Sequence, residues 1–120
     1  MSDSFKILGQ AVLGTGSWST TIYTVPDTPS ADLAPRQIMQ AIVSTIVVCN
    51  RDADLQKYSI RFVPKGETPG DKHTVISTKS LLPYATDVLS LGVGLSTGDI
   101  MYGYGSAANF SISVFGIEML

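Results

Sequence analysis

The sequence contains one cysteine, Cys49, and one histidine, His73, in 120 residues. A single cysteine forms no disulfide within the chain, which fits a reducing compartment. Structural zinc sites use about four cysteine or histidine ligands, so we expect no zinc site on this pair. Cys49 ends the apolar run IVVC, and we expect a buried, unreactive thiol there. His73 has charged and hydroxyl neighbours, which favours a surface or interface position over a ligand role.

Charge is also scarce. Asp, Glu, Lys and Arg make up 15% of the residues, against about 25% in a typical soluble domain. The formal net charge is −2 and the basic residues are interleaved with acids, so the basic stripe that nucleic-acid binding needs is missing. Hydroxyl residues take the place of charges, with 14 serines and 11 threonines. Such a surface resists association weakly, which favours a subunit that neighbouring chains cover.

Long apolar runs are missing too. The longest apolar region, IMQAIVSTIVVC at residues 38–49, is broken by Gln40, Ser44 and Thr45, whereas a membrane span needs about 20 apolar residues. The start MSDSFKILGQ has an acid where a signal peptide has basic residues. We therefore expect synthesis in the cytoplasm and no membrane partner.

Helical periodicity is replaced by strand patterns. Gly or Pro interrupts the chain every ten to fifteen residues or so, which is typical of an all-β domain. The stretch Lys57–Val63 alternates strictly, and Arg36–Asn50 is long enough to be one bent strand or two strands joined by a bulge. The expected strands are Phe5–Gln10, Ser19–Val25, Arg36–Asn50, Lys57–Val63, Lys72–Thr78, Asp87–Gly94, Asp99–Gly105 and Asn109–Met119.

These strands predict one domain over residues 1–120, with an all-β fold: an antiparallel β-sandwich of about eight strands, jelly-roll-like. The loop at residues 26–35 holds Pro26, Pro29 and Pro35, which exclude a central strand there.

The segment NRDAD, with Asn50, Asp52 and Asp54, has the first residues of a calcium loop. Such a loop needs Gly at its sixth position and an acid at its twelfth. Those positions hold Leu55 and Arg61. A polar hairpin turn is the better interpretation, because Asn and Asp suit turn conformations.

No catalytic pattern has its full context. The segment GLSTG at Gly94–Gly98 has the spacing Gly-x-Ser-x-Gly, but it lies between two expected strands, whereas a nucleophile elbow joins a strand to a helix. GTG at Gly14–Gly16 and GYG at Gly103–Gly105 lack the rest of a phosphate-binding loop. We therefore expect no enzyme activity, no catalytic residue, no cofactor and no metal. Aromatic residues leave one binding alternative, a sugar-stacking platform. Its candidate residues are Trp18 with Tyr23, or Tyr102 with Tyr104.

Several segments together carry a family resemblance: KILGQ, TIYTVP, IVVCNRDA, IRFVPKG, DKHTVI, GVGLSTGD and FSISVFGIE. They resemble small virion structural proteins of tailed bacteriophages, over nearly the whole chain. The resemblance implies a non-enzymatic component of the virion, at the tail, baseplate or fibre attachment, or on the capsid as a decoration (cement) protein. A carbohydrate-binding module of a fibre is a further alternative. The resemblance implies no functional residues.

The partners expected for such a role are further copies of the chain and other virion structural proteins. We expect a homo-oligomer, with a trimer as one option. The apolar chain ends support this expectation, because ends are usually polar unless something holds them. Phe5, Met119 and Leu120 should therefore pack on a sheet edge or on a partner. Phe5 and Phe115 are the candidate contact residues, and the alternative is that both are core residues.

Overall fold

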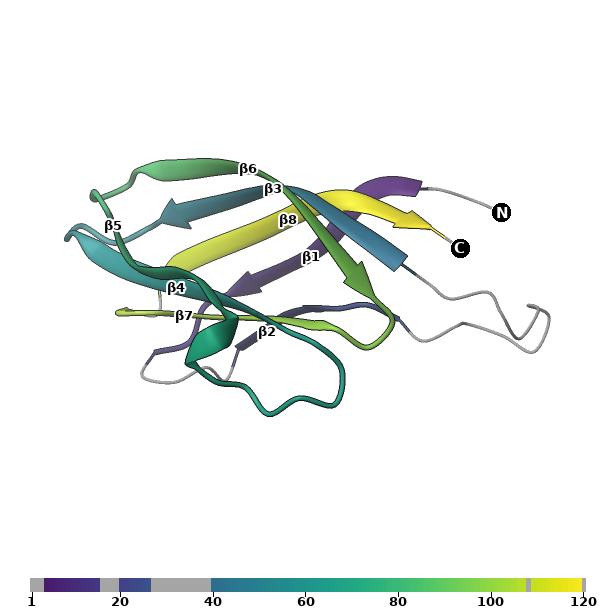
Figure 1. Cartoon of the computed structure of the whole chain (residues 1–120). Coiled ribbons are helices and arrows are strands. Elements are labelled where there is room, and N and C mark those ends of the chain that lie inside the picture. The colour runs from purple at the N-terminus through teal and green to yellow at the C-terminus, as the bar shows by residue number, and fades with distance from the viewer. Residues whose placement is uncertain (1–3, 16–19, 27–39, 108, 120) are drawn as a thin grey trace, which may run out of the picture.

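The computed structural model describes residues 4–15, 20–26, 40–107 and 109–119. Their strands form two four-stranded antiparallel sheets, which lie one over the other in Figure 1. Sheet A has the order β1-β8-β3-β6 and sheet B the order β2-β7-β4-β5. The strands are β1 (Ser4–Val12), β2 (Thr20–Thr24), β3 (Gln40–Asn50), β4 (Gln56–Val63), β5 (Thr74–Leu81), β6 (Thr86–Ser96), β7 (Ile100–Gly105) and β8 (Phe110–Met119).

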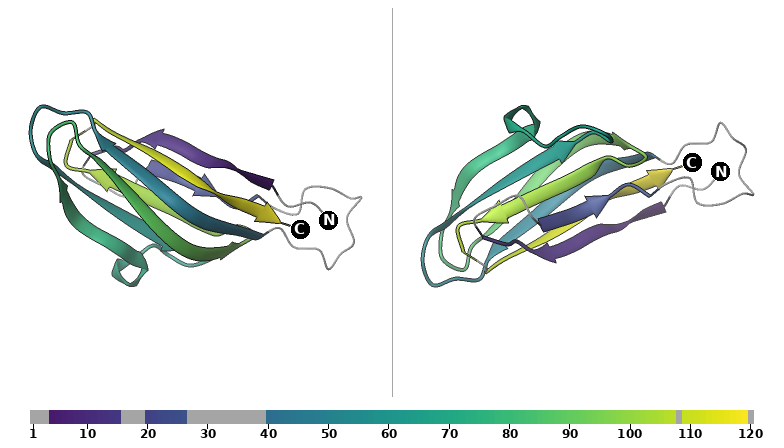
Figure 2. Two further views of the ribbon diagram at one scale, coloured as in Figure 1. Left: turned by 90° about the horizontal axis from the view of Figure 1, so that it is seen from above. Right: turned by 90° about the horizontal axis from the view of Figure 1, so that it is seen from below.

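The fold is the predicted antiparallel β-sandwich. Apart from β4 and β5, strands that follow one another in sequence lie in opposite sheets, and this interleaved order is that of a jelly roll. Figure 2 shows the two layers from above and from below, with the strands running along the long direction of the molecule. The molecule measures 51 × 28 × 20 Å along its principal axes.

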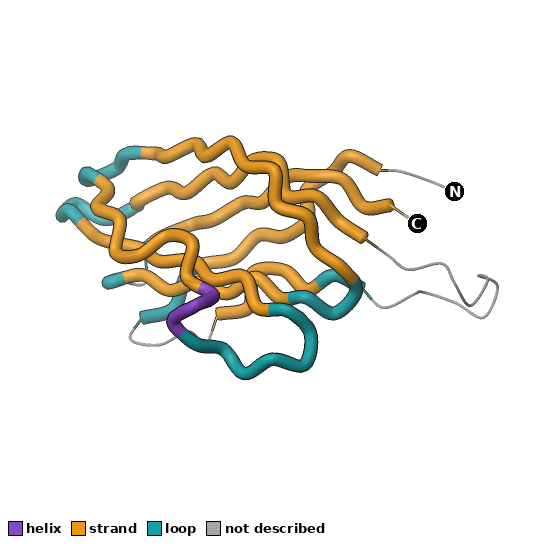
Figure 3. Tube along the Cα trace, in the orientation of Figure 1, coloured by secondary structure: helices purple, strands orange, loops and turns teal. Residues whose placement is uncertain are grey.

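The expected strand bounds hold within a few residues, with one correction. The strand expected at Lys72–Thr78 is β5, which begins later, at Thr74. The residues before it form a single 3-10 turn, η1 (Asp71–His73), drawn in purple in Figure 3. The expected strand positions 19 and 36–39 lie outside the described residues, as does most of the proline loop.

Sheet A is bent by bulges at neighbouring positions of three strands. The pairing shifts between Ile7 and Gly9 in β1 and between Val43 and Thr45 in β3. On β6, Val93 pairs with Val43 and Ser90 with Thr45, so β6 holds extra residues at the same level. The bulge in β3 was one of the two expected forms of this long segment. Its extra residue exchanges the faces of the strand, because side chains alternate with a period of two.

The core lies between the sheets. Strand β8 alternates without interruption, so Phe110, Ile112 and Val114 point inward and are almost completely buried. On β4, Tyr58 and Ile60 point into the same core, and Phe62 packs against it. Further core residues are Leu13, Ile22, Tyr23, Val25, Ala41, Val43, Ile46, Val48, Leu81, Leu95, Met101.

Candidate functional site: the uncharged outer face of sheet A

The outer face of sheet A, which we call face A, is the side turned away from sheet B. Cross-strand pairing arranges its outward residues in rows, because directly paired residues point to the same side. None of the paired outward residues in the described strands is charged. In the order β1, β8, β3, β6, the full rows are Phe5–Ile117–Ile42–Gly94, Ile7–Phe115–Thr45–Ser90, Gln10–Ser113–Val47–Val88 and Val12–Ser111–Cys49–Thr86, and Met119–Gln40–Ser96 extends them on three strands.

One end of face A is apolar. We call this cluster the apolar end; its members are Phe5, Ile7, Ile42, Phe115, Ile117 and Met119. Phe5 is 67% exposed and Ile7 is 51% exposed, while Phe115, Ile117 and Met119 are half-buried. The outer faces of sandwiches usually carry polar residues that alternate with the core residues. An exposed apolar cluster of this kind marks an interaction site.

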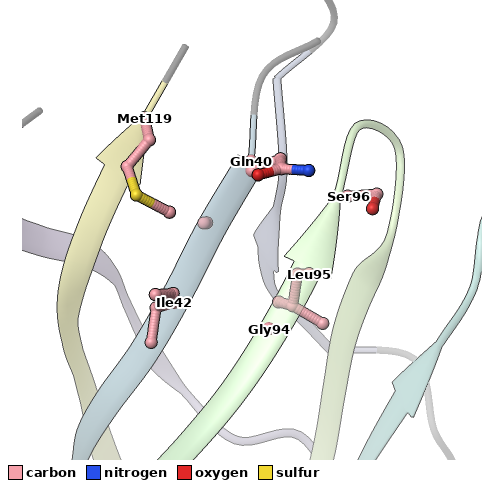
Figure 4. A pocket seen from close by; sticks show the side chains of 7 residues that line it. Gln40, Ile42, Gly94, Leu95, Ser96 and Met119 are labelled. Atoms are coloured by element: carbon pink, nitrogen blue, oxygen red, sulfur yellow. The ribbon is translucent and has the colours of Figure 1, made fainter. Parts of the chain in front are cut away.

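A hollow of about 310 Å³ lies at this end of face A. Figure 4 shows Ile42 and Met119 on one side of it and Gly94 between Ile42 and Leu95. Gly94 has no side chain, and a Cβ built on it would meet no atom within 4 Å. The other lining residues are Gln40, Ala41 and Ser96.

The outer face of sheet B differs, because the loop at residues 64–73 carries charges over it. On β4, Ser59 and Arg61 point outward, as the alternation of this strand implies, but both are buried. Arg61 donates to Asp71 at 3.1 Å and to Thr74 at 3.3 Å. The hydroxyl of Ser59 accepts the backbone N–H of Thr78 at 2.8 Å. The contrast makes face A the candidate contact surface.

Two tyrosines cross the core and donate to carboxylates of the opposite sheet. Tyr58 on β4 donates to Asp87 on β6 at 2.9 Å, and Lys79 lies 2.9 Å from the same carboxylate oxygen. In the same way, Tyr23 on β2 donates to Glu118 on β8 at 2.5 Å. Lys6 on β1 pairs with the other oxygen of Glu118, also at 2.5 Å. Each group joins the two sheets.

These groups have shifted pKa values. Burial raises the pKa of both tyrosines above the usual 10, and the hydrogen bond and negative charge of the carboxylate add to the rise. Burial also works to raise the pKa of Glu118 and Asp87, but the lysine and tyrosine donors outweigh it, so both pKa values are lowered. The tyrosines are therefore neutral and the carboxylates ionised at neutral pH. Every member is engaged in the pairing, which is a structural role.

The NRDAD segment is a polar turn. Asn50 is completely buried, and its amide donates to the carbonyls of Leu81, Leu82 and Asp54 at 3.0–3.1 Å. Its side-chain oxygen accepts the backbone N–H of Asp52 at 2.9 Å. Asn50 thus ties the β3–β4 turn to the β5–β6 loop. Within the described part of the chain, no three His, Cys, Asp or Glu side chains are grouped so that they could hold a metal ion.

His73 is buried, so the expected surface position is wrong. Its Nδ1 accepts the backbone N–H of Gly70 at 3.0 Å, and its Nε2 lies 3.0 Å from Glu67 Oε1. Lys72 pairs with the same oxygen at 3.1 Å. The ring can be buried because both nitrogens are hydrogen-bonded within its own loop. Neither nitrogen is directed at a serine or cysteine in this arrangement, so His73 does not form part of a nucleophilic triad here.

Cys49 is half-buried on face A, which corrects the expected buried position. The extra residue in the β3 bulge turns Val48 and Asn50 inward and Cys49 outward. Of the proposed sugar platform, Tyr102 and Tyr104 lie half-buried on the outer side of β7, and Tyr23 is a core residue. Trp18 lies outside the described residues.

Comparison of the chain with protein-family models, with curated proteins and with solved structures gave no match. In the described ranges, no helix has the length and apolar character to cross a membrane. The functional argument therefore rests on the residues of this chain, and above all on face A.

Sequence reasoning found individual residues of face A but not the face itself. It named Phe5, Phe115 and Met119 as contact residues, and all three point outward there. Leu120 lies outside the described residues. The uncharged rows require the strand order β1-β8-β3-β6 and the register, which no single segment contains. One signal was visible: the outward positions of β8 change from Ser111 and Ser113 to Phe115, Ile117 and Met119, so its outer side becomes apolar towards the end of the strand.

Proposed function

We propose that this chain is a non-enzymatic structural component of a tailed-phage virion, a tail, baseplate or fibre-attachment protein that acts through contacts between subunits. Face A is the observation that carries the proposal. Its paired outward positions bear no charge, and its apolar end leaves Phe5 and Ile7 more than half exposed. Fully buried interface centres are likewise depleted in charge and rich in aromatic residues and Met.

The assignment to a phage particle is supported by the resemblance of segments such as IVVCNRDA and FSISVFGIE to small virion proteins. The jelly roll agrees with it at the level of fold, because viral capsid and lectin domains use this fold. Fold alone does not define function. The proposed role as a subunit therefore rests on face A, and the assignment to a virion rests on the resemblance.

Two alternatives share this fold. A capsid decoration protein would use face A in the same way at another place in the particle. A carbohydrate-binding module of a fibre is favoured by Tyr102 and Tyr104, whose rings lie outward on one strand of sheet B. Labelling of the particle distinguishes a capsid decoration protein from a tail protein, and binding to a glycan array would identify a carbohydrate-binding module.

The test uses antibodies against the chain and electron microscopy of purified particles of the phage that encodes it. We expect label at the tail, baseplate or fibre base; label over the capsid would favour the decoration alternative. In a phage whose gene for the chain is deleted, we compare complementation by Ile42→Glu and by Thr24→Glu. Ile42 lies on face A, whereas Thr24 is exposed on the outer side of sheet B.

A buried unpaired charge is costly, so Ile42→Glu should enter particles at least about tenfold less than the native chain, a loss equivalent to about 1.4 kcal/mol. Thr24→Glu should enter normally. Particles without the chain, or equal incorporation of both variants, would contradict the proposal.

A further inference from the structure

Two rows at the apolar end of face A have most of their large residues on one side and their small residues on the other. In the row Phe5–Ile117–Ile42–Gly94, the β1 end carries an aromatic ring and the β6 end has no side chain. The next row, Ile7–Phe115–Thr45–Ser90, has its two large residues on β1 and β8 and its two small ones on β3 and β6. Apart from Ile42, large side chains in these rows belong to the β1–β8 half.

This division is self-complementary for one symmetry. If two copies stack face to face about a two-fold axis parallel to the strands, β1 of each lies over β6 of the other, and β8 lies over β3. Phe5 then stands over Gly94, Ile7 over Ser90, and Phe115 over Thr45, so these three large residues each meet a small one. Ile117 stands over Ile42, which is an apolar contact between two large residues. The hollow beside Gly94 has room for the exposed ring of Phe5.

Charge points to the same partner. Burying an uncharged face against a charged surface would leave the charges of that surface without water or counter-charge. A second copy of face A offers no charge at the paired positions. The partner that fits is therefore the chain itself.

The area of the face is sufficient. Strands of about ten residues at roughly 3.3 Å per residue, spaced about 4.8 Å apart over four strands, give a face of about 600 Å². Two such faces bury about 1,200 Å² together, which is at the lower end of specific interfaces. Sheets pack face to face at about 10 Å, with their strands rotated by about 30°.

We propose that two copies of this chain pack face A against face A about a two-fold axis parallel to the strands, with Phe5 of each copy in the hollow over Gly94 of the other. This contact deepens the proposed function, since it names the partner of the same surface. It also replaces the expected trimer by a two-fold contact as the basic unit.

The first test uses Gly94→Lys, with Thr24→Lys as the matched control. The Cβ at Gly94 meets nothing within 4 Å, so the monomer accommodates the new side chain, and replacing Gly in a strand favours the strand. In the dimer, the lysine fills the hollow and buries a charge. Multi-angle light scattering over a dilution series should give a dimer for the native chain and for Thr24→Lys. Gly94→Lys should be a folded monomer, with dimer affinity lowered more than about tenfold.

The second test establishes the direction of the axis. In a Cys49→Ser background, Gln10→Cys on β1 should lie over Val88→Cys on β6 of the other copy. A mixture of the two single variants, treated with a short bis-maleimide cross-linker, should give covalent dimers, and neither variant alone should do so. A mixture of Gln10→Cys with Thr24→Cys is the control and should give none.

The proposal is overturned by a native chain that is monomeric or trimeric, by a Gly94→Lys variant that still dimerises, by loss of the dimer in Thr24→Lys, or by cross-linking no greater than in the control. These failures are distinct from failure of the proposed function. A monomer that nevertheless labels virions would refute this contact alone. A cross-linked dimer that no virion contains would refute the virion role alone.

Discussion

Replacing Tyr58 by Phe should destabilise the protein by about 1.5–3 kcal/mol at pH 7, the range for a hydrogen bond to a charged group. Tyr58 is completely buried, and its hydroxyl donates at 2.9 Å to Asp87, which Lys79 keeps ionised. Phe keeps the ring and its packing on Phe110, whose centroid lies 5.5 Å away. The loss is therefore that of one oxygen and its hydrogen bond, and no large cavity forms.

The assay is urea unfolding followed by far-UV circular dichroism, at one total protein concentration because dimers unfold in a concentration-dependent way. Tyr84→Phe is the matched control; Tyr84 is 69% exposed, and we expect a change within about 0.5 kcal/mol. A Tyr58→Phe cost below about 0.5 kcal/mol at pH 7 would refute the argument.

The pH dependence adds two further checks. The lowered pKa of Asp87 means that its contribution is complete above the unfolded pKa of about 3.9 and is lost as the pH falls through the folded value. At still lower pH, the cost of Tyr58→Phe should fall to about 0.5–1.5 kcal/mol, the value for a neutral hydrogen bond. Because the pKa of Tyr58 is raised, its contribution to stability is fully present below pH 10, the usual pKa of a tyrosine, and declines above it, since the tyrosine of the unfolded chain ionises first. Tyr58→Phe should reduce that alkaline decline.

Two other substitutions test the turn and the thiol. Asn50→Ala should lower the free energy of unfolding by about 3 kcal/mol, because the buried carbonyl of Leu81 loses the donor that Asn50 supplies and the hydrogen bonds from Asn50 to the turn are lost as well. A loss under about 1 kcal/mol in thermal unfolding would contradict its role in joining the two loops. Cys49→Ala should lower the free energy of unfolding by less than about 1 kcal/mol, because the side chain is only half-buried. Labelling of Cys49 by a thiol reagent should be slower in the native dimer than in the monomeric Gly94→Lys variant, because the dimer covers face A. Equal labelling rates would contradict that covering.

The sequence predicts the strands of this protein well where burial is one-sided. FSISVFGIEM alternates without a break, and β8 lies where the pattern places it, with Phe110 and Ile112 inward. KYSIRFV also alternates as predicted, yet Arg61 is buried because the loop at residues 64–73 packs over it. A local pattern gives the direction of a side chain, but whether a distant loop covers that side depends on tertiary structure.

The errors have the same origin. Cys49 was expected in the core because the β-branched run before it reads as buried on both sides. The bulge between Val43 and Thr45 fixes which side of β3 is inward, and nothing in AIVSTIVV marks where the extra residue falls. His73 was expected at the surface because its neighbours are polar, but Glu67 and Gly70 supply partners for both ring nitrogens. Face A was not predicted from the sequence, because it forms only when four strands that are distant in sequence pair with one another.

The β3 bulge determines which residues of this strand face the core on each side of it. Ala41 and Val43 point inward before the bulge, and Ile46, Val48 and Asn50 point inward after it. Ser44 is the extra residue, because Val43 and Thr45 pair with the consecutive residues Gly116 and Phe115. Deleting Ser44 would therefore remove the bulge and leave residues 40–43 on their present faces.

Deleting Val47, with the bulge kept in place and residues 48–50 held in register by β8, would instead shift the residues before it by one position. Ile42 would then enter the core, and Ala41 and Ile46 would join the contact surface. The position of a deletion in this strand therefore decides its cost, because one at the bulge keeps both faces and one after it alters the core and the outer face together.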